Sequence, residues 1–189
     1  MSLGKIASVF ILSSFLATTT LAEEEIFTGD LRLSCEAILC LSTGTRPNEC
    51  MPSIARYFSI NHKKWSDTIR GRINFLNMCP ATHSDQKMNS LIDAIANGAG
   101  RCDAASLNSS QMVWRGINRG YYISNNLPNH CSNYTNHSYT DLKTSAPRYV
   151  GTPQKNGYWV EATDYDKALK AYNEHIAKRN SERSSLWND

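Results

Sequence analysis

Six cysteines constrain the fold of this 189-residue chain more than any other feature of its sequence. All six lie downstream of residues 1–22, a segment with the pattern of a secretory signal. An even number of cysteines in an exported chain predicts disulfide bonds. No two of them are spaced Cys-x-x-Cys, which argues against a thioredoxin-type redox motif and against a zinc ribbon. They are Cys35, Cys40, Cys50, Cys79, Cys102 and Cys131.

The signal prediction depends on the order of charge and apolar residues in the first 22 positions. Lys5 precedes an apolar run over residues 6–17, and Ala22 provides a small residue at the expected cleavage point. The run is shorter than the roughly 20 residues that span a bilayer, and no later stretch is apolar enough to do so. We therefore expect residues 23–189 to form an exported, periplasmic protein with no transmembrane segment.

The charge balance argues against direct binding of nucleic acid. The chain carries 20 Lys and Arg against 17 Asp and Glu, a formal net charge of +3. Loss of residues 1–22 removes one lysine and no acid, so the net charge falls to +2. A nucleic-acid-binding domain is typically far more basic.

Amphipathic patterns predict a helical domain in residues 23–120. Apolar residues recur at three- and four-residue intervals, as in the stripe that begins at Trp65. Ser34, Ser84 and Asp103 are predicted to cap helices. Short connections favour antiparallel packing of neighbouring helices. The predicted helices span Leu33–Ser42, Met51–Ser59, Lys64–Met78, Ser84–Asn97, Asp103–Leu107 and Gln111–Asn118.

Residues 121–189 have a different composition, rich in Tyr, Asn, Ser and Thr, and the segments 125–129 and 133–140 are predicted loops. A short β-hairpin is predicted from two apolar runs joined through an Asn156-Gly157 turn. A C-terminal helix follows from Thr163, and we expect fraying from Ser181 onward. The two hairpin strands are Arg148–Val150 and Tyr158–Val160, and the apolar face of the helix consists of Ala168, Leu169, Tyr172 and Ile176.

The predicted fold class is therefore mainly α, a small disulfide-linked helical bundle. Its loop-rich second half adds the hairpin and the C-terminal helix to the same core. On a helix, Cys35 and Cys40 point roughly 140° apart, so each should reach a different element. This favours the pairs Cys35–Cys79, Cys40–Cys50 and Cys102–Cys131, although six cysteines allow many other connectivities.

Candidate catalytic groups are few. Glu36 lies on an apolar helix, the setting in which a glycosidase raises the pKa of its general acid. A glutamate near a helix start is also favoured by the helix dipole, and this is the interpretation we prefer. Ser84 and Lys87 match the Ser-x-x-Lys motif of penicillin-recognising enzymes, but the sequence that resembles the second motif, at Ser59, precedes the first instead of following it. We therefore predict no catalytic residue.

The sequence also predicts no metal and no cofactor. The nearest cluster of metal-ligand types is His130-Cys131 with His137 six residues later, in a polar segment and without a second close cysteine. No glycine-rich loop is long enough to bind phosphate groups.

Two surfaces are candidates for binding a partner. A basic cluster with one tryptophan could dock an acidic partner or an anionic wall polymer, although such clusters are more often solvated helix faces. The aromatic residues of the second half are equally consistent with interface anchors and with core residues. The basic cluster consists of Arg56, Lys63, Lys64, Trp65, Arg70 and Arg72.

Several motifs together resemble the TrbM/KikA family of conjugal transfer proteins. The pattern Cys-x4-Cys-x9-Cys from Cys35 is followed by Phe-Leu-x-x-Cys-Pro, which ends at Pro80. The resemblance covers residues 33–80, is weaker to Asn118 and adds little for the second half. The segments that carry it are residues 33–44, 46–50, 57–60 and 72–80.

The resemblance implies a small exported protein encoded with a plasmid type IV secretion system. We expect a periplasmic accessory protein that binds other envelope proteins of the conjugation machinery and is not an enzyme. Two alternatives remain open: a hydrolase of peptidoglycan or another envelope polymer centred on Glu36, and a host-directed toxin or inhibitor.

Overall fold

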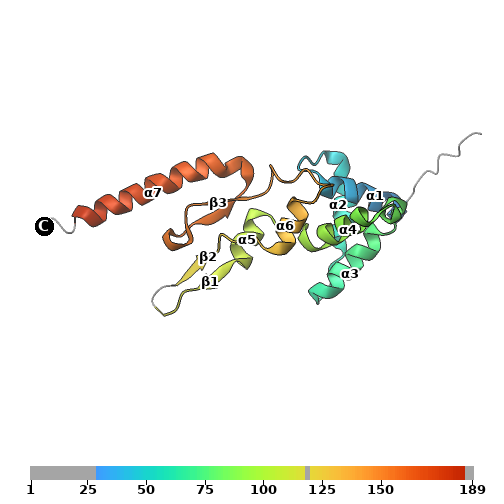
Figure 1. The fold of residues 1–189 in the computed structure, drawn as a ribbon, viewed down its shortest axis with the longest axis horizontal. Coiled ribbons are helices and arrows are strands. Elements are labelled where there is room, and N and C mark those ends of the chain that lie inside the picture. Colours follow the sequence, from blue (N-terminus) through green and yellow to red (C-terminus); the bar gives the residue numbers. More distant parts are fainter. Residues whose placement is uncertain (1–28, 118–119, 186–189) are drawn as a thin grey trace, which may run out of the picture.

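The computed structural model describes residues 29–117 and 120–185, so the predicted signal lies outside the described residues. The chain is mainly helical and contains three disulfides, two small hairpins and a long C-terminal helix, which confirms the predicted fold class. The molecule is elongated, with a bundle of helices at one end and the C-terminal helix projecting at the other (Figure 1).

The bundle consists of short helices connected by tight turns. Helix α4 packs against α6 and α3, while α1 packs against α2 and α3. Their apolar faces meet in one core that includes Leu41, Tyr57, Leu76 and Ile95. The helices are α1 (Gly29–Ser42), α2 (Met51–Ser59), α3 (Trp65–Leu76), α4 (Gln86–Gly98), α5 (Ala104–Ser110) and α6 (Asn129–Thr135), with 3-10 turns at Asn48–Cys50 and Pro80–His83.

Two of the predicted helix caps are wrong. Ser34 lies inside α1, which begins at Gly29, and its hydroxyl donates to the Leu31 carbonyl at 2.7 Å. Helix α4 is capped by Asp85, whose carboxylate accepts the Met88 N–H at 2.8 Å, and not by Ser84. The predicted cap of α5 is confirmed, because Asp103 accepts the Ser106 N–H.

Two segments of the middle region differ from their predictions. Residues 111–118 were predicted to be helical, but β1 (Met112–Trp114) pairs antiparallel with β2 (Tyr121–Ile123). The predicted loop around Asn133 contains α6, whose Tyr134 is buried against α4. Gly98 allows this close packing, since a Cβ at that position would lie 2.5 Å from the Cβ of Tyr134.

The predicted C-terminal hairpin is confirmed by the pairing of β3 (Arg148–Val150) with β4 (Tyr158–Val160). Its connection is longer than a two-residue turn: a 3-10 turn at Pro153–Lys155 ends at Asn156, which has a left-handed φ of 60°. Trp159 is buried and joins the core of the bundle.

Helix α7 (Tyr165–Ser185) follows a 3-10 turn at Ala162–Asp164 and begins against β3, where the Arg148 guanidinium lies over the Tyr165 ring. The side chains predicted for its apolar face are half-buried, and from Ala177 onward every described residue is exposed. The helix extends to Ser185, beyond the predicted fraying point at Ser181.

Three disulfides join these elements, and they are the pairs that the helix geometry favours. The Cα atoms are 5.0 Å apart in Cys35–Cys79, 5.7 Å in Cys40–Cys50 and 5.4 Å in Cys102–Cys131.

Within the described residues, no helix is both long and apolar enough to cross a membrane.

Candidate functional site

The predicted basic cluster is divided between the core and the surface. Arg72 is buried, and its guanidinium lies over the rings of Tyr57, Phe58 and Trp65 at 4.7, 5.1 and 5.2 Å from their centroids. Its Nε donates to the Ile60 carbonyl at 3.3 Å. Arg72 therefore stabilises the packing of α2 against α3 and cannot belong to an exposed docking surface.

Arg56 also has partners within the molecule. Its guanidinium forms an ion pair with Asp30 at 2.6 Å and lies over the Phe75 ring. The hydrogen bond from Arg56 lowers the pKa of Asp30 below its ordinary value. This bidentate contact joins α2 to the start of α1, so Arg56 contributes to the bundle itself.

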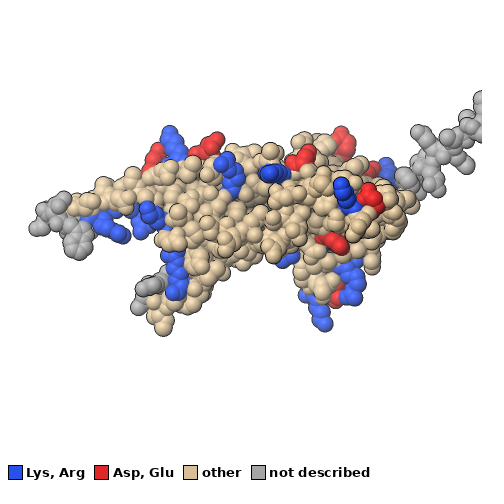
Figure 2. All heavy atoms as spheres, viewed as in Figure 1, with Lys and Arg blue, Asp and Glu red and all other residues tan. Residues whose placement is uncertain are grey.

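The exposed part of the cluster is the loop before α3 and its first turns. Lys63 and Lys64 are exposed, and Arg70 forms an ion pair with Asp67. Trp65 is partly exposed, with the Arg101 guanidinium 4.8 Å from its ring centroid. In Figure 2 this end of the bundle shows basic and acidic groups side by side. The exposed charge is therefore mixed.

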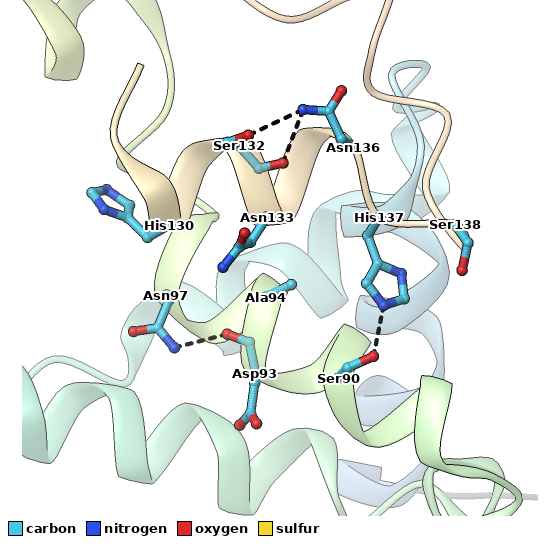
Figure 3. A pocket seen from close by; sticks show the side chains of 10 residues that line it. All are labelled: Ser90, Asp93, Ala94, Asn97, His130, Ser132, Asn133, Asn136, His137 and Ser138. Carbon is cyan, nitrogen blue, oxygen red and sulfur yellow. Dashed lines mark hydrogen bonds between the residues drawn. The ribbon is translucent and has the colours of Figure 1, made fainter. Parts of the chain in front are cut away.

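A polar cleft lies between α4 and α6 (Figure 3). Its volume is about 730 Å³. The close-up shows Asn133 on α6 pointing toward α4, while the His130 ring points outward from the end of α6 and the carboxylate of Asp93 points away from α6. Its lining consists of Ser90, Asp93, Ala94, Asn97, His130, Ser132, Asn133, Asn136, His137 and Ser138.

The cleft contains a serine–histidine pair whose hydrogen bonds have a defined direction. His137 Nδ1 accepts the Tyr139 backbone N–H at 3.1 Å, which places the proton of the neutral ring on Nε2. Nε2 therefore donates to Ser90 Oγ at 2.9 Å, and the Ser90 hydroxyl donates to the Lys87 carbonyl at 2.8 Å. Burial and the charge of Lys87 lower the pKa of His137 and favour this neutral form.

This direction is opposite to the one that nucleophilic catalysis needs. A serine nucleophile donates its proton to a histidine lone pair, whereas the His137 lone pair here faces the Tyr139 amide. The pair can fix the shape of the cleft and present polar groups to a ligand, but it does not activate Ser90.

The closest group of metal-ligand types in the described part of the chain is Cys102, His130 and Cys131. The two sulfurs are bonded to each other and offer no thiolate. Burial and the nearby charge of Arg101 lower the pKa of His130. The sequence analysis grouped His137 with His130 and Cys131 as possible metal ligands. In the structure, the His137 ring is hydrogen-bonded to the Ser90 hydroxyl.

Glu36, the residue of the hydrolase alternative, lies on a half-exposed face of α1. Its carboxylate pairs with Arg32 one turn earlier at 3.4 Å. Glu36 does not line the α4–α6 cleft.

The aromatic residues of the second half divide between core and surface. Tyr134 and Trp159 are buried, and the Tyr134 hydroxyl donates to the Leu41 carbonyl. Burial raises the pKa of Tyr134 to about 12, so this hydroxyl remains a donor at neutral pH. Tyr121 and Tyr139 are exposed.

The sequence predictions missed the β1–β2 hairpin, on which several large apolar side chains are exposed. Ile117 is 85% exposed, and the Trp114 and Tyr121 rings lie against each other with centroids 4.7 Å apart. Two short apolar runs on either side of Gly116 and Gly120 were the available signal. We call the following exposed side chains the hairpin surface: Met112, Val113, Trp114, Ile117 and Tyr121.

Comparison with known proteins extends the family resemblance beyond the first half. The TrbM family model matches residues 26–173, a region that contains all six cysteines, both hairpins and the first part of α7. No curated protein and no solved structure matches the chain. Since the match covers most of the sequence, the chain belongs to the TrbM family of conjugal transfer proteins.

Proposed function

We propose that this chain is a periplasmic accessory protein of a plasmid type IV secretion system that acts by binding other envelope proteins of the conjugation machinery. The observation that carries the proposal is the TrbM family match over residues 26–173. The proposal adds a compartment and a mode of action to that membership.

The three disulfides support the compartment. They pair all six cysteines, and no free cysteine is present. Such bonds persist in oxidising compartments such as the periplasm and are rare in the cytosol. Export through the signal predicted in residues 1–22 would place the chain there.

Two contacts support binding over catalysis. The Ser90 hydroxyl donates to a carbonyl and receives a proton from His137, so it is not prepared as a nucleophile. Glu36 pairs with Arg32 on a half-exposed face of α1. The hairpin surface provides exposed Trp, Tyr and Met side chains, which are enriched at protein interfaces.

The test of location uses cells that carry the complete transfer system. We expect the protein in the periplasmic fraction, beginning near Glu23, with no thiol that reacts with an alkylating reagent before reduction. A cytoplasmic protein with reactive thiols and an intact leader would contradict the proposal.

The test of mode of action compares two substitutions in a plasmid that lacks the native gene. We expect Glu36→Gln to support transfer at the native frequency, because the proposed function needs no acid at this position. Arg32→Gln is the matched control, since it breaks the same ion pair without touching the carboxylate. Loss of transfer in Glu36→Gln alone, with an unchanged melting temperature, would favour the envelope-polymer hydrolase.

A further inference from the structure

The β1–β2 hairpin is fixed to the body along β2 and open along β1. The Ile123 carbonyl accepts the Tyr149 hydroxyl at 2.7 Å, and the Ser124 carbonyl accepts the Trp159 indole N–H at 2.9 Å. Beyond the end of β1, the Arg115 guanidinium donates to the Pro153 carbonyl. All three residues of β1 are exposed, and the hairpin extends from the body (Figure 1).

The pairing register determines which backbone groups of β1 face outward. Bonds between Arg115 and Gly120 and between Ser124 and Gln111 identify the hydrogen-bonded pairs of the ladder. Hydrogen-bonded and non-hydrogen-bonded pairs alternate in an antiparallel ladder, so Met112 and Trp114 belong to non-hydrogen-bonded pairs. Their N–H and C=O groups point away from β2 and have no hydrogen-bond partner among the residues that the structure describes.

Proteins usually protect an open strand edge by keeping the strand very short, or with charged residues, proline, a bulge or a covering segment. The three residues of β1, Met112-Val113-Trp114, form a short edge that carries no charge and no proline, and β1 pairs only with β2 in the described chain. An exposed apolar edge on a hairpin that is hydrogen-bonded to the body is suited to receiving another strand.

Charge identifies the kind of strand that fits. The sequence contains no acidic residue between Asp103 and Asp141, and Arg115, at the loop end of the ladder, has its guanidinium over the Tyr122 ring. Figure 2 shows no acidic atoms on the visible part of the hairpin. Pairing with a second copy would bring two such surfaces together without a compensating acid, whereas an acidic partner would complement the arginine.

We infer that the outer edge of β1 binds an extended segment of another protein, apolar with acidic residues, which adds to the hairpin as a third strand. This inference rests on the proposed function, because it assigns a surface and a partner chemistry to the binding role. The Met112 and Trp114 backbone groups supply the hydrogen bonds, and the hairpin surface supplies the apolar contact.

The test places the photoreactive amino acid p-benzoylphenylalanine at Met112 in cells that carry the complete transfer plasmid. We expect an adduct with one protein of the transfer system, with the cross-linked residue in an extended acidic and apolar segment. A second probe at Leu39, exposed on α1, reports binding elsewhere. An adduct only with lipid, only with a second copy, or no adduct from Met112 would overturn the inference.

Two pairs of variants examine the backbone and the charge with the Met112 probe in place. Trp114→Pro and Trp114→Ala both lack the indole, so their difference reports the outward N–H of residue 114, which β2 does not use. We expect the adduct yield of Trp114→Pro to be about 10-fold below that of Trp114→Ala. We expect Val113→Glu to reduce the yield about 10-fold below Val113→Lys, because only the glutamate repels an acidic partner.

Equal yields within either pair, in proteins with unchanged melting temperatures, would overturn the inference. The outcomes also separate it from the proposed function. An adduct from Leu39 but none from Met112 rejects the β1 edge and leaves a binding protein. No adduct from either probe, with normal transfer after deletion of the gene, rejects the binding function as well.

Discussion

Arg72 belongs to the basic cluster in the sequence but does not contribute to the exposed surface in the structure. In the sequence it is one of several basic residues near Trp65, but in the structure it is 6% exposed and enclosed by aromatic rings. A guanidinium can take this position because it is planar and weakly hydrated, and it lies favourably over ring faces. Among the described residues it forms no ion pair, so the rings and the Ile60 carbonyl are its main partners.

The burial of Arg72 predicts a clear difference from its exposed neighbour Lys64. Arg72→Ala should lower the free energy of unfolding by about 2–4 kcal/mol, because it leaves a cavity among three rings. Arg72→Lys should cost about 1–2 kcal/mol, since an ammonium group cannot lie flat between rings. Lys64→Ala should change stability by less than about 0.5 kcal/mol. Urea denaturation measures all three, and equal stability of Arg72→Ala and Lys64→Ala would contradict the role of Arg72.

The two histidines of the α4–α6 cleft predict how stability depends on pH. Burial lowers the pKa of both His130 and His137, and the charges of Arg101 and Lys87 add to the effect. The unfolded chain therefore takes up protons near the ordinary histidine pKa of about 6.5 before the folded chain does. The free energy of unfolding should fall as pH decreases below this value, and the loss should level off below the folded-state pKa values.

Urea midpoints at pH 7.5 and pH 5.5 measure this dependence. The double variant His130→Gln with His137→Gln removes both groups and should flatten the profile between the two pH values. Carboxylates such as Asp85, whose pKa is lowered mainly by the Met88 N–H, lose their contribution at lower pH and leave this interval largely unaffected. A native protein that is more stable at pH 5.5 than at pH 7.5 would contradict the assignment.

At the scale of elements, the sequence predicts those segments whose pattern is long and amphipathic. Helices α2, α3 and α4 were predicted to within two residues at each end, because each presents an apolar stripe to the core. The prediction failed at β1 and α6, which span three and seven residues and carry no such stripe. Helix α6 consists of Asn, His, Ser, Tyr and Thr around Cys131, and its contact with Gly98 and α4 outweighs its weak helix propensity.

The cap of α4 provides a test of element boundaries. Asp85→Ala removes the acceptor of the Met88 N–H and should lower the free energy of unfolding by about 1 kcal/mol. Ser84→Ala is the matched control and should have an effect of only a few tenths of a kcal/mol, since the Ser84 side chain caps no helix in the structure. Thermal or urea denaturation of the two variants measures the difference. A larger loss of stability for Ser84→Ala than for Asp85→Ala would mean that Ser84, the residue predicted from the sequence, caps α4.

At the scale of the whole molecule, the core is continuous between the two halves. Tyr134 and Trp159, from the second half, belong to the same buried cluster as Leu41 and Ile95. The candidate sites were less predictable than the core, because exposure depends on which neighbours cover a side chain. Arg72 was expected on the surface and is buried, while the exposed hairpin surface lies partly in a segment expected to be helical.

The three disulfides should differ in how much they stabilise this core. A disulfide restricts the unfolded chain more as the loop that it closes becomes longer. The bonds span 44, 29 and 10 residues for Cys35–Cys79, Cys102–Cys131 and Cys40–Cys50. On the chain-entropy model their removal should cost about 4, 3.5 and 3 kcal/mol, respectively.

Paired serine substitutions measure this order by urea denaturation under oxidising conditions, one disulfide at a time. Loss of Cys102–Cys131 should have a second consequence, because this bond joins the start of α5 to α6 and so fixes the second half to the bundle. Limited proteolysis of that variant should cleave between residues 103 and 130 before the bundle itself is degraded. Cleavage that begins within α1–α3 instead would mean that the shared core, and not the disulfide, holds the two halves together.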